Sequence, residues 1–263
     1  LTSADVGIVV DSAAAESKKV ADLVLLERDL GVVAEGVSEG RTSFANASKY
    51  IRIASSSNFG NICSVAASSI FLPFVPATAT QLLLLNLCYD ATCLSLSWDN
   101  VDDAEIARPR AWSGKGLGSF MLHFGFASSA FDIITFAILF LGVCPAVCGA
   151  PFAALDAAGR AAFIATFQAG WLLECAWTES LVLLVLRTRS VRDGDRPCTP
   201  LVVMVAVMLV VTALLALSPV AQLFGLATLP VWYLGIVALL SVLYLVVAST
   251  IKRVYLARSS SLF

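Results

Sequence analysis

The chain has 263 residues, of which 59% are hydrophobic and 14% are charged. Its mean hydropathy of +0.86 excludes an ordinary soluble domain and indicates a membrane protein with several spans. The formal net charge of -2 gives no indication of a nucleic-acid partner, and the single histidine excludes a histidine metal cluster.

Residues 1–34 have the pattern of one strand, one helix and a second strand. The apolar runs Val6–Val10 and Leu23–Leu26 predict the strands, and Asp11-Ser12 offers an N-cap for a helix that ends near Ala21. A segment of this length is too short to bury a hydrophobic core of its own. We therefore expect part of a larger α/β domain, cut from a longer protein.

The pattern becomes helical from about Leu30, and no proline interrupts the stretch from Glu35 to Leu72. A helix of that length measures about 57 Å, whereas the hydrocarbon core of a bilayer is about 30 Å thick. Charged residues, Lys49 and Arg52 among them, predict that residues 35–53 face water. We expect these residues to form a cytoplasmic stalk that continues into the membrane.

Six apolar segments predict six membrane spans, so the fold class is mainly α, a polytopic bundle with a small N-terminal α/β unit. The first span follows the stalk and ends at Leu72; the others are about Leu82–Trp98, Phe120–Val143, Phe167–Leu186, Leu201–Leu217 and Trp232–Ile251. Residues 54–251 form the predicted membrane domain and 252–263 a cytoplasmic tail. Residues Cys144–Thr166 are predicted to be a loop. A locally unwound segment near Asn86–Asp90 would suit an ion site, because freed backbone carbonyls can help to coordinate a cation.

Six spans place both termini on one side of the membrane, and the 17 Lys and Arg residues indicate which side. Six of them precede the first span, and ten follow the second, fourth and sixth spans; Arg160 alone falls on the opposite side. By the positive-inside rule both termini are cytoplasmic. We expect an integral protein of the plasma, or inner, membrane with the lipid bilayer as a partner.

Four polar side chains lie at membrane depth in the first two spans. Asn58 and Asn61 are three residues apart, and Asn86 and Asp90 four, so each pair is expected to line one helix face. Unpaired charges and amides in hydrocarbon are costly, so they normally face the protein interior, a cavity or an ion path. The pattern predicts an intramembrane metal cation site, and the alternative is amides that join helices by hydrogen bonds.

Three further acids lie in the later spans. Glu179 is a candidate metal ligand or a residue that supports one. Glu174, on a different face, is expected near the membrane interface or paired with a polar neighbour. Asp132 lies inside the third span, and its role in transport stays open.

Segments spread over the whole chain carry a resemblance to a known family. They are Ala4–Ile8, Val20–Asp22, Gly40-Arg41, Phe44–Asn46, Lys49–Ile51, Ser56–Asn61 and Asn86–Asp90. Together they resemble the C-terminal part of P-type ATPases: the flank of the GDGxND motif, the stalk, and the cation-site motifs of the fifth and sixth membrane helices. Asp99–Asp103 and Phe167–Trp171 are similar to the bacterial magnesium-importing branch in particular.

The resemblance implies that the six spans are the fifth to tenth of ten, in a pump driven by ATP. Asn58, Asn61, Asn86 and Asp90 then match cation-site positions, with Mg²⁺ as the transported ion. The calcium-pump branch is expected to have a Glu where this chain has Asn61. A site with few acids suits Mg²⁺, which keeps several of its waters and binds through one or two carboxylates.

The chain contains neither a DKTGT sequence nor the GDGxND motif. Phosphoryl transfer needs a nucleophile and Mg²⁺ ligands, so the chain alone is not expected to hydrolyse ATP, and it offers no catalytic or nucleotide-binding residues. ATP and its Mg²⁺ would bind in N-terminal pump domains, present in cis or as a separate chain. The alternatives are a pump for calcium, sodium, potassium or protons, a secondary transporter or channel, and a non-transporting membrane fragment.

Overall fold

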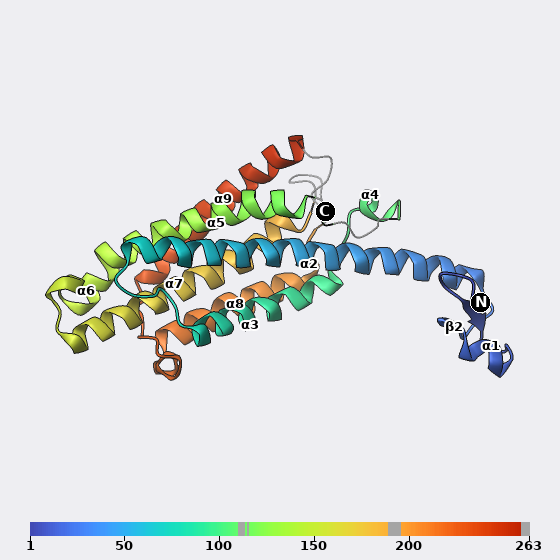
Figure 1. The fold of residues 1–263 in the computed structure, drawn as a ribbon, viewed down its shortest axis with the longest axis horizontal. Helices are drawn as coiled ribbons and strands as arrows, with labels where there is room; N and C mark the ends of the chain where they lie inside the picture. The colour runs from blue at the N-terminus through green and yellow to red at the C-terminus, as the bar shows by residue number, and fades with distance from the viewer. Residues whose placement is uncertain (110–113, 115, 189–195, 259–263) are drawn as a thin grey trace.

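The computed structural model describes residues 1–109, 114, 116–188 and 196–258 (Figure 1). Its helices and strands are β1 (Ile8–Val10), α1 (Ala15–Lys19), β2 (Leu23–Leu25), α2 (Leu30–Phe71), α3 (Ala79–Leu94), α4 (Asp103–Ile106), α5 (Leu117–Ile138), α6 (Cys144–Cys148), α7 (Ala157–Leu186), α8 (Thr199–Leu217) and α9 (Tyr233–Arg258). The chain is thus mainly helical, as the sequence predicts. Arg110, Lys115, Arg189 and Arg192, which contribute to the predicted orientation, lie outside the described residues.

The N-terminal unit has the predicted order of strand, helix and strand. β1 and β2 pair in parallel, with Ile8 opposite Leu23 and Val10 opposite Leu25. The predicted N-cap at Asp11-Ser12 is wrong, because α1 begins only at Ala15. The side chain of Asp11 forms an ion pair with Lys18 at 2.6 Å instead, and Ser12 accepts hydrogen bonds from Arg28.

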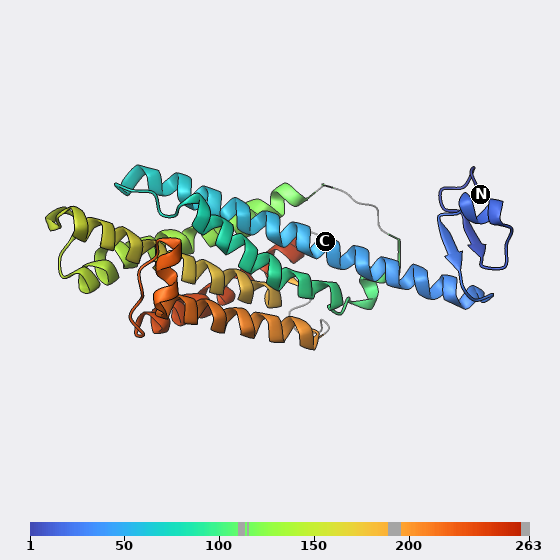
Figure 2. The same ribbon diagram turned by 90° about the horizontal axis from the view of Figure 1, so that it is seen from below.

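The 42-residue helix α2 is unbroken, as predicted, and is about 63 Å long. The Asp29 side chain caps its first turn by accepting a hydrogen bond from the Gly31 backbone N–H, and the helix ends before Pro73. Figures 1 and 2 show α2 running along the bundle and extending beyond it to the N-terminal unit. The prediction that its stalk faces water is wrong at Lys49, which is 3% exposed.

Four helical segments of the described chain are long and apolar enough to cross a membrane: Leu117–Cys148, Ala157–Leu186, Thr199–Leu217 and Tyr233–Ala257. The predicted count of six is therefore not confirmed. The helix α3 has only 16 residues, and the part of α2 beyond the stalk is rich in Ser and Asn. Both helices nevertheless belong to the bundle, since α2 packs along α5 and α3 packs against α7.

Two segments are more helical in the structure than the sequence suggests. The helix α3 is regular through Asn86–Asp90 and has no unwound segment there, and it tightens into a 3₁₀ turn only at Ser95–Trp98. The predicted loop Cys144–Thr166 is also largely helical. The chain continues from α5 through a π-helical turn at Leu139–Val143 into α6, and α7 starts at Ala157, where Asp156 caps the Gly159 N–H.

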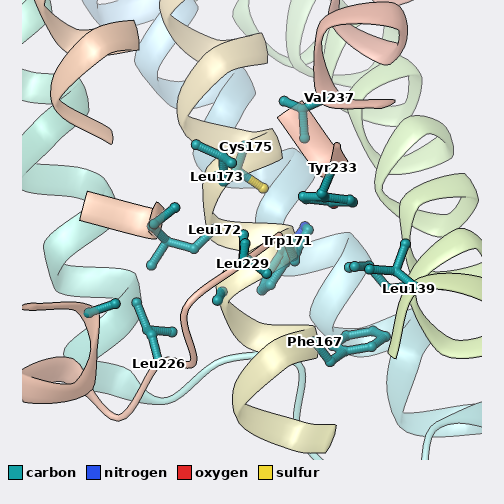
Figure 3. Packing of buried hydrophobic residues seen from close by; sticks show 14 of the residues in the cluster. Leu139, Phe167, Trp171, Leu172, Leu173, Cys175, Leu226, Leu229, Tyr233 and Val237 are labelled. Atoms are coloured by element: carbon teal, nitrogen blue, oxygen red, sulfur yellow. The ribbon is translucent and has the colours of Figure 1, made fainter. Parts of the chain in front are cut away.

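The helix α7 lies at the centre of the hydrophobic core. Its buried side chains Phe167, Trp171 and Cys175 lie near Leu139 of α5's π turn and near Tyr233 of α9 (Figure 3). Tyr233 Oη donates a hydrogen bond to the Gly170 carbonyl at 3.1 Å, and a Cβ at Gly170 would clash with Leu139. Because α7 is buried almost all round, its polar side chains cannot reach water and must find partners inside the bundle.

Candidate metal centre

The side chain of Asn61 on α2 meets that of Glu179 on α7 in the interior of the bundle. Asn61 Nδ2 donates a hydrogen bond to Glu179 Oε1 at 2.9 Å, although the two residues are 118 positions apart. Their exposed fractions are 7% and 4%. In this contact the amide nitrogen, and not the amide oxygen, faces the carboxyl group; both side chains nevertheless carry oxygen atoms, the ligands that Mg²⁺ and other hard cations prefer.

Asn58 does not share this environment, because its side chain is exposed on the surface of the described structure. Residues three apart on a helix differ by roughly 60° in direction at 3.6 residues per turn. On α2 this angle crosses the edge of the buried face, so Asn61 points inward and Asn58 outward. The prediction that both line one face of the site stays untested for any ion-bound state.

Asp90 and Asn86 on α3 also lie toward the outside of the bundle. Asp90 is exposed and Asn86 is half-buried. Tyr50 Oη of α2 donates a hydrogen bond to Asp90 Oδ1 at 3.3 Å, and both residues line a groove of about 640 Å³ between α2 and α3. Among the described residues, no hydrogen bond joins Asp90 to the Asn61–Glu179 pair. The groove leaves the Asp90 carboxylate accessible from outside the bundle.

Asp132 on α5 and Glu174 on α7 form a second buried acid pair, 3% and 1% exposed. Their carboxyl oxygens and the Cys175 sulfur lie within 4.8 Å of one another. Of the two alternatives expected for Glu174, the structure shows the polar partner, because Glu174 is buried beside Asp132 and Cys175. The sequence contains an indication of this burial, because α7 is apolar on all sides and leaves Glu174 no face open to water.

A third polar cluster lies where the stalk meets the bundle, and nothing in the local sequence predicts it. Arg187 Nε donates to both carboxylate oxygens of Asp99 at 2.9 and 2.7 Å, and Lys49 Nζ donates to Asp99 Oδ2 at 3.2 Å. Asn46 Nδ2 also donates to the Asp99 carbonyl at 2.9 Å. Burial lowers the pKa of Lys49, and the nearby Asp99 carboxylate acts in the opposite direction.

This ion cluster and the Asn61–Glu179 bond connect the same two helices. Lys49 and Asn61 both lie on α2, and Arg187 follows the end of α7, which carries Glu179. The ion cluster therefore holds α2 against α7 near Lys49, and the hydrogen bond between Asn61 and Glu179 holds the two helices together further along α2. Movement of the stalk along α7 would have to break both contacts.

Comparison with known proteins adds independent information. Residues 74–254 match the family model described as "Cation transporting ATPase, C-terminus". The chain is 40% identical over 234 residues to "Magnesium-transporting ATPase, P-type 1" of Salmonella typhimurium, a match that covers 89% of this chain and 24% of that protein. The Escherichia coli K12 protein of the same name is 39% identical over 235 residues, covering 89% of this chain and 25% of the relative.

Similarity to calcium-transporting relatives is more restricted. "Calcium-transporting ATPase 3, endoplasmic reticulum-type" of Arabidopsis thaliana is 33% identical over 113 residues, which cover 42% of this chain and 11% of the relative. The chain spans about a quarter of the length of the magnesium-transporting relatives that it matches. These relatives are P-type ATPases, as the resemblance in the sequence predicts.

Proposed function

Because the chain belongs to the family of cation-transporting ATPases and matches its C-terminal part, we propose that it forms the membrane domain of an ATP-driven pump that imports magnesium. The similarity to magnesium-transporting P-type ATPases over 89% of the chain supports the choice of ion. In this proposal the ATP site lies in N-terminal domains, and the present chain carries the path of the ion.

The observation that carries the proposal is the buried contact between Asn61 and Glu179, with Asp90 accessible in the groove nearby on α3. A buried carboxylate beside an amide at membrane depth joins helices, relays protons or binds a cation, and the family match favours the cation. We propose Asn58, Asn61, Asn86, Asp90 and Glu179 as the metal ligands. The set contains two carboxylates, which fits a hexahydrated ion that sheds only some of its waters.

The exposure of Asp90 in the groove is compatible with this proposal for a geometric reason. The chain spans about a quarter of the length of its magnesium-transporting relatives. In the proposed pump, a further membrane helix from the rest of the protein packs over the groove between α2 and α3. That packing closes the cation site and removes Asp90 from the lipid.

The proposed membrane topology has six spans, with α2 and α3 as the first two and both termini in the cytoplasm. The Ser and Asn side chains of α2 and the short length of α3 are tolerable in a membrane because both helices pack against α5 and α7. Residues 1–34 are the end of the phosphorylation domain, 35–53 the stalk, 54–251 the membrane domain and 252–263 the tail.

The mechanism uses α2 as a lever between the catalytic domains and the ion. Its continuous backbone from Leu30 to Phe71 transmits movement of the N-terminal unit to Asn61 without an intervening hinge. The ion cluster at Asp99 ties the stalk to α7, so movement of the stalk along α7 breaks this contact. Phosphorylation and dephosphorylation would then open the Asn61–Glu179–Asp90 region alternately to the two sides of the membrane.

The test is ATP-dependent ²⁸Mg²⁺ uptake by the full-length pump that carries Asp90→Asn. Loss of a ligand carboxylate weakens metal binding by about tenfold or more, so we expect at least a tenfold rise in the Mg²⁺ concentration for half-maximal uptake. Asp103→Asn is the matched control, because Asp103 is an exposed acid at the start of α4, the short helix that follows α3 in the chain, and its removal should leave uptake unchanged.

Each outcome separates one of the alternatives. Unchanged Mg²⁺ uptake by Asp90→Asn would contradict the proposed site and favour a domain in which the polar groups only join helices. Uptake of Ca²⁺ in preference to Mg²⁺ by the unaltered pump would retain the pump but contradict the proposed ion. Uptake without ATP would indicate a secondary transporter or a channel.

A further inference from the structure

A buried glutamine in the segment Phe167–Trp171 lies outside the set of proposed ligands. It is Gln168 on α7, which is 5% exposed and meets Gln81, 1% exposed, in the first turn of α3. Gln81 Nε2 donates a hydrogen bond to Gln168 Oε1 at 3.0 Å. Because a buried amide without a partner is costly, this contact joins α3 to α7 at a defined point.

The other partners of the two amides fix their orientation. Gln81 Nε2 also donates to the Phe224 carbonyl at 3.2 Å, and Gln81 Oε1 accepts from the Thr78 backbone N–H at 2.9 Å. Gln168 Nε2 donates to the Val75 carbonyl at 3.1 Å. A backbone N–H can only donate and a carbonyl can only accept, so each amide has one allowed orientation. Every nitrogen and oxygen of the two side chains therefore has a partner.

A second polar contact joins the same two helical segments at their other ends. Asp99, just after the 3₁₀ turn that follows α3, binds Arg187, which follows α7 directly. Eighteen residues separate Gln81 from Asp99, and nineteen separate Gln168 from Arg187. The helices α3 and α7 therefore run in the same direction, and the two contacts agree on one axial register between them.

This register sets the level of the two proposed carboxylate ligands. Asp90 is nine residues after Gln81, and Glu179 is eleven residues after Gln168. At 1.5 Å per residue these steps are about 14 and 17 Å, so the Cα atoms of the two acids differ by about 3 Å along the helix axes. Asp90 lies midway between the two polar contacts of α3, and Glu179 lies near the middle of the matching stretch of α7.

The apolar packing between the helices does not fix this register by itself. Leu85 of α3 belongs to the same hydrophobic cluster as Leu172 and Leu173 of α7. Apolar side chains of similar size can exchange neighbours when one helix slides, whereas an amide hydrogen bond is lost once its atoms move apart by much more than its normal length. A single buried amide is sufficient to specify the register of paired helices in coiled coils.

We propose that Gln81 and Gln168 are positioning residues for the cation site: their hydrogen bond sets the axial register at which Asp90 on α3 comes level with Glu179 on α7. The inference rests on the proposed function, because it takes both acids as ligands of the transported cation. It adds two residues that act on the cation through these ligands and not by direct contact.

The experiment measures ATP-dependent ²⁸Mg²⁺ uptake and melting temperature for the full-length pump with Gln81→Met, Gln168→Met and both changes together. Each single variant leaves one buried amide without its partner, so both properties should deteriorate. The double variant leaves neither amide unpaired and should regain much of the melting temperature. Its Mg²⁺ concentration for half-maximal uptake should stay raised by about tenfold, because the ligands remain out of register, with the maximal rate within about twofold of wild type.

Gln222→Met is the matched control, because Gln222 is an exposed glutamine two residues before Phe224 at the same end of the bundle. It should change neither the uptake nor the melting temperature. A wild-type Mg²⁺ concentration for half-maximal uptake in the double variant would overturn the positioning role, since the amides would then only stabilise the fold. If the methionine variants do not fold, Gln168→Asn decides: its amide is one methylene shorter, so a raised concentration supports the proposal and an unchanged one overturns it.

Asp90→Asn, measured in the same assay, separates this proposal from the proposed function. If Asp90→Asn weakens uptake and the double glutamine variant does not, only the positioning role is contradicted. If neither change affects uptake, the cation site itself is contradicted, and the positioning role with it.

Discussion

Replacement of Asp99 by alanine is expected to lower the free energy of unfolding by about 3–5 kcal/mol. The Asp99 side chain is fully buried between Lys49 and Arg187, whose side chains are 4% and 2% exposed. Its removal leaves two cations in the interior without the carboxylate that balances them, and their mutual repulsion adds to the loss of hydration. The measurement is denaturant or thermal unfolding of the purified protein in detergent.

A control and a compensating variant make this prediction specific. Asp103→Ala removes an exposed carboxylate four residues away and should change the free energy of unfolding by less than about 0.5 kcal/mol. Replacing the three charged residues together by Lys49→Met, Asp99→Leu and Arg187→Leu should recover most of the lost stability, because apolar side chains leave no buried charge. Equal stability of Asp99→Ala and wild type would show that the ion cluster does not stabilise the fold.

Gly125→Ala is the second substitution with a large expected effect, of about 1–3 kcal/mol. The helices α2 and α5 approach so closely that a Cβ at Gly125 would lie 2.7 Å from Phe59 Cδ1 and 3.1 Å from the Ser56 carbonyl. The backbone at Ser56 cannot move without moving α2. Because α2 also carries Asn61, the substitution should weaken the contact with Glu179 and reduce Mg²⁺ uptake along with stability.

Gly118→Ala is the matched control for this contact. Gly118 belongs to the same helix α5, and a Cβ there would meet no atom within 4 Å. Alanine should leave stability unchanged or raise it by up to about 1 kcal/mol through helix propensity. A similar small effect of Gly125→Ala would contradict the close packing of α2 on α5.

The sequence predicts the features of the site that follow from the free-energy cost of placing a polar side chain in lipid. An amide or carboxyl in an apolar helix must turn away from lipid, and Asn61 and Glu179 are buried as this argument requires. The orientation of Asn58 depends on the rotation of α2 about its axis, which packing against α5 fixes. The rotation of α2 about its axis cannot be derived from the composition of the helix, so the outward position of Asn58 was not predictable.

The ion cluster and the acid pair depend on partners distant in the chain. Lys49 has the sequence context of a water-facing stalk residue, and only the approach of Asp99 and Arg187 buries it. The helix α6 is a different kind of error: Pro145 is compatible with the first turn of a helix, and the helix ends at Gly149 with a positive φ of 79°. Proline and glycine in one short segment predict a loop equally well.

The most direct test of the proposed cation site is the position of the ion itself. Crystals of the full-length pump soaked in Mn²⁺, which accepts the same oxygen ligands as Mg²⁺, would give an anomalous difference peak at each bound ion. We predict a peak between α2, α3 and α7 in contact with Asp90 and Asn61, directly or through one coordinated water. A peak elsewhere in the membrane domain, with Asp90 still facing the lipid, would contradict the site.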